Sequence, residues 1–117
     1  MPDPVGEKYQ LAGFDARERG FNRLVEFIRT SSGYQATLRY ESSRIITPEA
    51  PNPTEALKQL ILLLQRDGYK QLRSQQSYRD GIYLGSQELW VEYPDRPPVS
   101  ATGMVELLRK WFRRSSP

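Results

Sequence analysis

Residues 52–68 read NPTEALKQLILLLQRDG and contain the clearest secondary-structure signal in the chain. Asn52 can cap a helix, Pro53 suits its first position, and the carboxylate of Glu55 can reach back to the amide of the cap. Gly68 suits the left-handed residue that ends a helix. The apolar residues gather within about 160° of a helical wheel: Ala56, Leu57, Leu60, Ile61, Leu63 and Leu64. The pattern predicts one long amphipathic helix over 53–67, lying across one face of a sheet.

Strand patterns precede this helix. Over 34–40, Tyr and aliphatic residues alternate with Gln, Thr and Arg, which is the period of two of a half-buried strand. Residues 21–30 fit a helical face as well as a strand, but their β-forming residues and the following turn-like Ser31-Ser32-Gly33 favour a strand. We therefore expect a hairpin here. Residues 44–47 predict a short third strand before Pro48.

The chain after the helix predicts a meander of strands. Residues 69–78 form a polar stretch that suits a strand at a sheet edge. Asp80-Gly81 is typical of a tight hairpin turn leading into 82–84, and residues 85–87 predict another turn before a strand over 89–93. The predicted fold class is α+β, a small antiparallel sheet in the order β-β-(β)-α-β-β-β, followed by a short C-terminal amphipathic helix.

The 117 residues fit one domain with extensions at both ends. Scattered apolar residues among Pro and Gly predict a flexible N-terminal arm over 1–20. Residues 21–95 form the single α+β domain, and 96–103 form a Pro-rich linker. Residues 104–114 predict a basic amphipathic helix, and 115–117 form a tail. The apolar stripe of that helix is Met104, Val105, Leu107, Leu108, Trp111 and Phe112.

The composition excludes much of enzyme chemistry. The chain has no Cys and no His, which removes disulfides, thiolate metal sites, the Ser-His-Asp arrangement and the commonest general base. Glu88 and Glu92 lie about 13 Å apart along one predicted strand, too far for a single magnesium site. We therefore expect no catalysis, no cofactor, no metal and no small-molecule substrate.

The sequence carries no recognisable targeting signal. The first residues, MPDPVGEK, lack the basic and apolar regions of a secretory signal, and the aliphatic run over 60–64 is much shorter than a membrane span. We expect a small soluble cytoplasmic protein.

The charge is divided unevenly along the chain. Residues 1–95 carry 12 Lys or Arg and 13 Asp or Glu, a net charge of −1, whereas residues 96–117 carry five basic residues and one acidic residue, a net charge of +4. A globular reader of nucleic acid usually spreads its basic residues over one face of its body. The basic C-terminal segment is thus more typical of a separate contact element.

These patterns predict a small adaptor or assembly module of unknown function that binds another macromolecule, with a protein as the favoured partner. Its contact elements are the C-terminal helix and the face of the sheet that carries Trp90, with Leu62 as an exposed position on the first helix. The candidate binding residues are Arg39, Leu62, Tyr83, Trp90, Leu108, Arg109, Lys110, Trp111, Phe112, Arg113 and Arg114.

Three alternatives remain open. Tyr83, Trp90 and neighbouring Arg and Lys residues could stack on single-stranded RNA. The basic helix could instead lie on an anionic membrane surface. Finally, the helix could fold back and bury Trp111 and Phe112 against Trp90, because a linker of about eight extended residues reaches roughly 25 Å.

Overall fold

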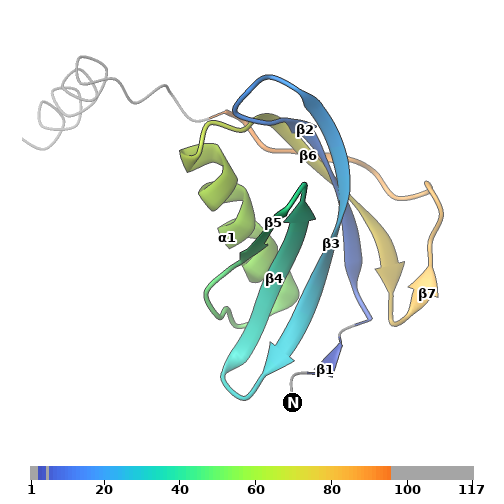
Figure 1. The fold of residues 1–117 in the computed structure, drawn as a ribbon. Helices are drawn as coiled ribbons and strands as arrows, with labels where there is room; N and C mark the ends of the chain where they lie inside the picture. The colour runs from blue at the N-terminus through green and yellow to red at the C-terminus, as the bar shows by residue number, and fades with distance from the viewer. Residues whose placement is uncertain (1–2, 5, 96–117) are drawn as a thin grey trace, which may run out of the picture.

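A computed structural model describes residues 3–4 and 6–95 of the chain. Within these residues, Figure 1 shows one helix against a strongly twisted antiparallel sheet, so the predicted α+β class with a small antiparallel sheet is confirmed. The helix α1 spans Pro53–Arg66. The strands are β1 (Asp3–Pro4), β2 (Lys8–Phe14), β3 (Gly20–Thr30), β4 (Gly33–Tyr40), β5 (Ser43–Ile46), β6 (Lys70–Arg79), β7 (Ile82–Tyr83) and β8 (Val91–Glu92).

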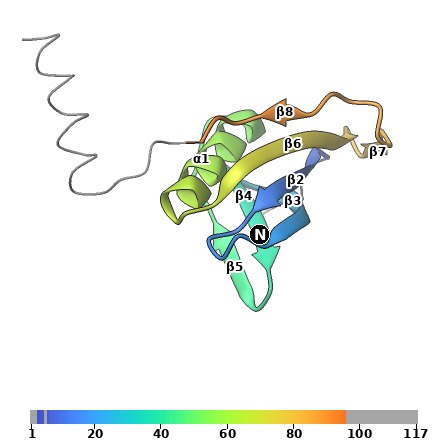
Figure 2. The same ribbon diagram turned by 90° about the horizontal axis from the view of Figure 1, so that it is seen from above.

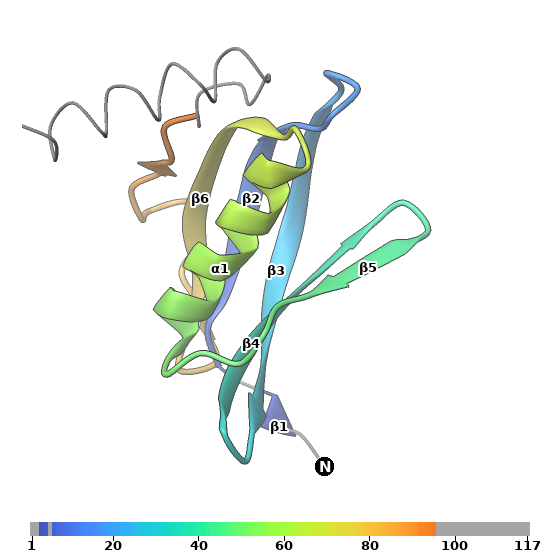
Figure 3. The same cartoon turned by 90° about the vertical axis from the view of Figure 1, so that its left-hand side faces the viewer.

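The strands follow the spatial order β5-β4-β3-β2-β6-β7, while β1 pairs with β3 and β8 pairs with β6. Seen from above, α1 lies on one side of the sheet, and β8 runs along the outer side of β6 (Figure 2). Turned so that α1 faces the viewer, the helix crosses β2, β3 and β6, while the β4–β5 hairpin extends to one side (Figure 3). Among the described residues, one face of the sheet is therefore covered by α1.

The ends of α1 follow from local chemistry. The side chain of Asn52 accepts a hydrogen bond from the amide of Glu55 at 2.9 Å, as a helix cap does. At the other end, Gly68 has a φ of 96°, a conformation that glycine adopts without steric cost. The amide of Tyr69 then donates to the carbonyl of Leu64, which closes the last turn.

The core lies between α1 and the sheet. Val25, Leu38 and Leu60 are fully buried there, contributed by β3, β4 and α1. Residues 21–30 form a strand and not a helix, and they pair with β4 as the predicted hairpin, with Val25 opposite Leu38. The short strand predicted over 44–47 is present as β5.

The prediction of a flexible arm over residues 1–20 is wrong. Lys8–Phe14 forms β2, which lies in the middle of the sheet between β3 and β6, and its Leu11 is fully buried. The alternation of this strand is difficult to detect because the consecutive residues 11–13 are all buried, so neither face of the strand is marked by polar side chains. Its register against β6 also shifts twice, each time with one extra residue on β6. The domain therefore includes residues before position 21.

The prediction that residues 69–78 form a sheet edge is also wrong. β6 pairs with β2 on one side and with the short strands β7 and β8 on the other. Its buried polar side chains have hydrogen-bond partners. The hydroxyl of Ser74 lies 2.7 Å from that of Tyr93, and the side-chain amide of Gln75 donates to the backbone carbonyl of Glu88 at 2.8 Å. A polar strand is thus interior here because its side chains are hydrogen-bonded.

The predicted linker over 96–103, helix over 104–114 and tail over 115–117 lie outside the described residues.

Candidate binding surface

The face of the sheet that points away from α1 forms the candidate binding surface, here called the outer face. Side chains alternate along a strand, and residues opposite each other on paired strands share a face. Leu24 pairs with Gln10, which pairs with Gln75, and Ala12 pairs with Arg73. The outer face comprises Lys8, Gln10, Ala12, Phe14, Asn22, Leu24, Glu26, Ile28, Gln35, Thr37, Arg39, Arg73, Gln75, Trp90 and Glu92.

Trp90 lies at one side of the outer face, beside β6. Val91 pairs with Ser74, so Trp90 is placed next to Gln75. The guanidinium carbon of Arg73 lies 5.2 Å from the centroid of the Trp90 ring, which is cation–π geometry. Trp90 nevertheless remains 38% exposed. A large aromatic ring is therefore held in place by a cation while part of its surface stays open to solvent.

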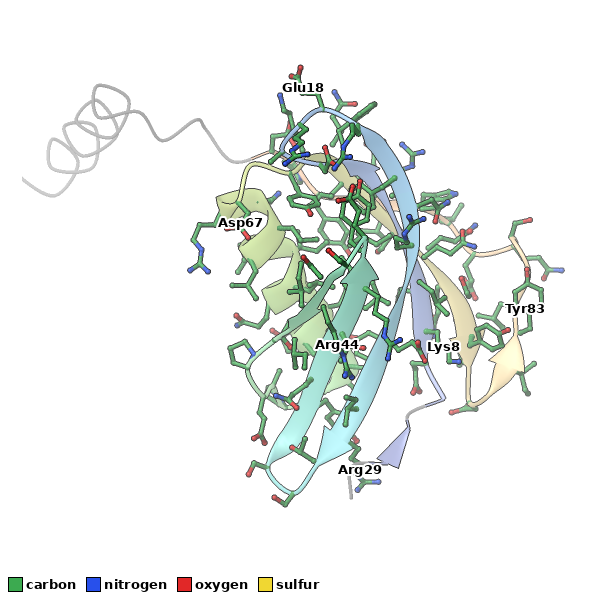
Figure 4. All side chains as sticks on the ribbon, viewed as in Figure 1. Lys8, Glu18, Arg29, Arg44, Asp67 and Tyr83 are labelled. Atoms are coloured by element: carbon green, nitrogen blue, oxygen red, sulfur yellow. The ribbon has the colours of Figure 1, made fainter. Side chains whose placement is uncertain are left out.

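Tyr83 lies on β7, across the hairpin turn from the end of β6. It pairs with Tyr78, and the two ring centroids are 5.2 Å apart. The ammonium of Lys8 lies 5.2 Å from the Tyr78 ring centroid and 3.7 Å from the carboxylate of Glu26. Figure 4 shows Lys8 and Tyr83 on the side of the molecule away from α1. Two aromatic–cation groups thus lie along β6, one at Trp90 beside the strand and one at Tyr78 within it.

The structure does not bring Arg39 and Leu62 to this place. Arg39 is exposed on β4, and β3, β2 and β6 lie between it and the segment that carries Trp90. Leu62 is 46% exposed on α1, in the other layer of the molecule. Of the predicted binding residues, Tyr83 and Trp90 alone flank the same strand, and residues 108–114 lie outside the described part of the chain.

Sequence reasoning missed several exposed apolar residues near the predicted ones. Leu89 is 86% exposed and lies next to Trp90, while Phe14 and Leu24 are exposed on the outer face itself. The sequence does contain a signal for Leu24. Along β3, buried apolar residues such as Phe21 and Val25 alternate with polar ones, and Leu24 is an apolar residue at a position where this alternation predicts a polar one. Phe14 could not be found this way, since β2 itself was not recognised.

Two carboxylates near Trp90 are engaged in structural contacts, while Glu92, which pairs with Arg73, is exposed. Glu88 forms an ion pair with Arg79 at 2.7 Å, and the carboxylate of Asp95 accepts a hydrogen bond from the amide of Gln71 at 2.7 Å. An open pocket of about 390 Å³ lies between residues 71–73 and 92–95. Within residues 3–4 and 6–95, no group of three or more acidic side chains is placed to hold a metal ion.

A second polar cluster surrounds Asp15 in the loop between β2 and β3. Its buried carboxylate accepts hydrogen bonds from the amides of Arg17 and Arg19, from the guanidinium of Arg19 and from the hydroxyl of Tyr40, all between 2.7 and 2.9 Å. Burial alone raises the pKa of Asp15, but these hydrogen bonds outweigh it and lower the pKa from 3.8 to about 2. The cluster fixes the loop and is fully satisfied internally.

We expect replacement of Asp15 by Asn to destabilise the fold at neutral pH, because the new amide nitrogen faces the Arg19 and Tyr40 donors. In the wild type, the pKa of Asp15 in the folded state lies below its unfolded value. Asp15 therefore contributes to the free energy of unfolding above pH 3.8, and this contribution is lost as the pH falls towards 2. Urea unfolding at pH 7 and between pH 4 and 2 should show a smaller acid loss in Asp15→Asn. Asp80→Asn, in an exposed turn, is the control that keeps the wild-type profile.

Comparison with known proteins gives no match among family models, curated proteins or solved structures. No helix in the described part of the chain has the length and apolar character needed to cross a membrane.

Proposed function

We propose that this protein is a small non-catalytic adaptor or assembly module that binds another protein through the outer face around Trp90 and through residues 104–114. The observation that carries the proposal is the partly exposed Trp90 ring, braced by Arg73 on a sheet face that α1 does not cover. Trp, Tyr and Arg are the residues that most often dominate the free energy of protein–protein binding.

The surroundings of Trp90 support this proposal. Leu89 and Val91 are 86% and 53% exposed, so three consecutive residues present apolar surface beside β6. Exposed apolar residues that occur singly need no explanation, but a group of them is typical of a contact surface. The engaged carboxylates of Glu88 and Asp95, together with the lack of His and Cys in the sequence, support a binding role over a catalytic one.

The proposal is tested by capture with the full chain as bait, followed by reconstitution with the purified partner. We expect Trp90→Ala to weaken binding by about tenfold or more, as truncation of a central aromatic residue does. Leu62→Ala removes a somewhat more exposed apolar side chain from the other layer and should leave the affinity unchanged. Equal affinities for wild type and Trp90→Ala, measured by calorimetry, would argue against the proposed surface.

Two further measurements on the full chain test the other classes of partner. Quenching of Trp fluorescence by short single-stranded oligonucleotides, weakened by salt, would replace the protein partner with RNA. Binding to anionic vesicles, lost when the chain is truncated after Asp95, would replace it with a membrane surface. A loss of cooperative unfolding in that truncated chain would make residues 96–117 part of the architecture and would remove the main support for an adaptor.

A further inference from the structure

The outer face contains a row of residues whose dimensions suit a short helix. Leu24, Gln10 and Gln75 are cross-strand neighbours, and Trp90 lies beside Gln75. Three strand spacings place Leu24 about 14 Å from Trp90. The middle of the row is already covered by its neighbours, since Gln75 is 5% exposed with its side-chain amide on the carbonyl of Glu88, and the adjacent Ala12 is 3% exposed. Partly exposed apolar side chains thus stand at both ends of a row whose centre is buried.

The described chain ends close to this row. The carboxylate of Asp95 accepts a hydrogen bond from the backbone amide of Gln71, and the preceding residue, Lys70, pairs with Phe14. Phe14 belongs to the outer face and is 38% exposed. The eight residues from 96 to 103 reach roughly 25 Å when extended, which is enough to bring the following segment onto the row.

Residues 104–112 have the pattern needed to cover it. Their sequence places the side chains of Leu107, Leu108, Trp111 and Phe112 on one stripe, with Arg109 and Lys110 on the opposite side. A helix of about ten residues is about 15 Å long and is marginally stable alone, so its stripe requires a surface. The tether also gives this segment an effective concentration in the millimolar range, above that of a free competitor.

We infer that residues 104–112 dock as an amphipathic helix on the outer face of the same chain, across the row from Leu24 to Trp90. The inference concerns the free protein and goes beyond the proposed function. Its consequence for binding does rest on the proposed function: a protein partner that uses the Trp90 surface has to displace the segment first. The side of α1 that faces away from the sheet is a poorer docking site, because Leu62 is the one strongly exposed apolar residue of the described helix.

A spin label tests the docking directly, because the chain has no Cys and accepts a single engineered one. A nitroxide attached to Ser115→Cys should reduce the amide signals of Ala12, Leu24 and Gln75, and should leave those of Lys58 and Leu62 on α1 unchanged. The effect should persist on dilution. It should be absent when a spin-labelled chain is mixed with a separate ¹⁵N-labelled chain.

Matched variants in the segment provide the control. Leu108→Gln removes part of the apolar stripe and should abolish the signal loss, whereas Arg109→Gln changes the opposite side and should preserve it. Unchanged amide shifts for Leu60 verify in each case that the core is intact. The inference is overturned if the signal loss is absent, is found on α1, or occurs only between different chains. None of these readings requires a partner, so they are independent of the test of the proposed function.

Discussion

Replacement of Leu11 by Ala is expected to lower the free energy of unfolding by about 3 kcal/mol, the typical cost of a Leu-to-Ala cavity in a close-packed core. Leu11 is fully buried on β2, where it belongs to the same cluster as Val25, Leu60 and Leu72. Removing the side chain leaves a gap that neither the sheet nor α1 can close without disturbing the others. Urea unfolding followed by circular dichroism measures the loss.

The matched control is Leu62→Ala on α1. The same atoms are removed, but Leu62 is 46% exposed and should change the free energy of unfolding by less than about 1 kcal/mol. The comparison also separates the two interpretations of the N-terminal residues. A flexible arm over 1–20 would make Leu11→Ala as mild as Leu62→Ala, and that result would contradict the placement of β2 in the sheet.

Local signals in the sequence were sufficient to predict the elements whose apolar and polar residues alternate in step with their buried and exposed faces. The cap at Asn52 and the apolar face of α1 fix that helix within a few residues, because both depend on neighbours in sequence. The alternation of β4 was equally readable, since Ala36 and Leu38 face the core and Arg39 faces solvent. The tight turn at Asp80-Gly81 follows from two residues that tolerate positive φ.

Other features depended on contacts distant in sequence. β2 is recognisable only through its pairing with β3 and β6, because its consecutive buried residues 11–13 hide the period of two. The burial of Ser74 on β6 depends on Tyr93, which approaches from the end of the described chain. Among the candidate site residues, Tyr83 and Trp90 flank one strand, but the distance of Arg39 from them follows from the strand order, which no local pattern specifies.

Replacement of Gly33 by Ala is expected to destabilise the fold by about 3 kcal/mol, the sum of backbone strain and a steric clash. Gly33 has a φ of 153°, which residues with a side chain rarely adopt. A methyl group here would overlap the carbonyl oxygen of Ala50. That oxygen accepts the amide hydrogen of Tyr34 at 2.8 Å, and Ala50 donates back to Tyr34 at the same distance.

The clash therefore acts on the connection between the start of β4 and the segment that leads into α1. Moving Ala50 away would break both hydrogen bonds of its bridge to Tyr34 and would shift the chain just before the cap at Asn52. Gly20→Ala is the matched control, since its methyl would make ordinary contact with Phe14 at 3.8 Å and its backbone has no positive φ. Thermal and urea unfolding should show Gly20→Ala within about 0.5 kcal/mol of the wild type. Equal stability of the two variants would mean that the loop from 47 to 52 yields without loss, and that β4 does not position α1 through Ala50.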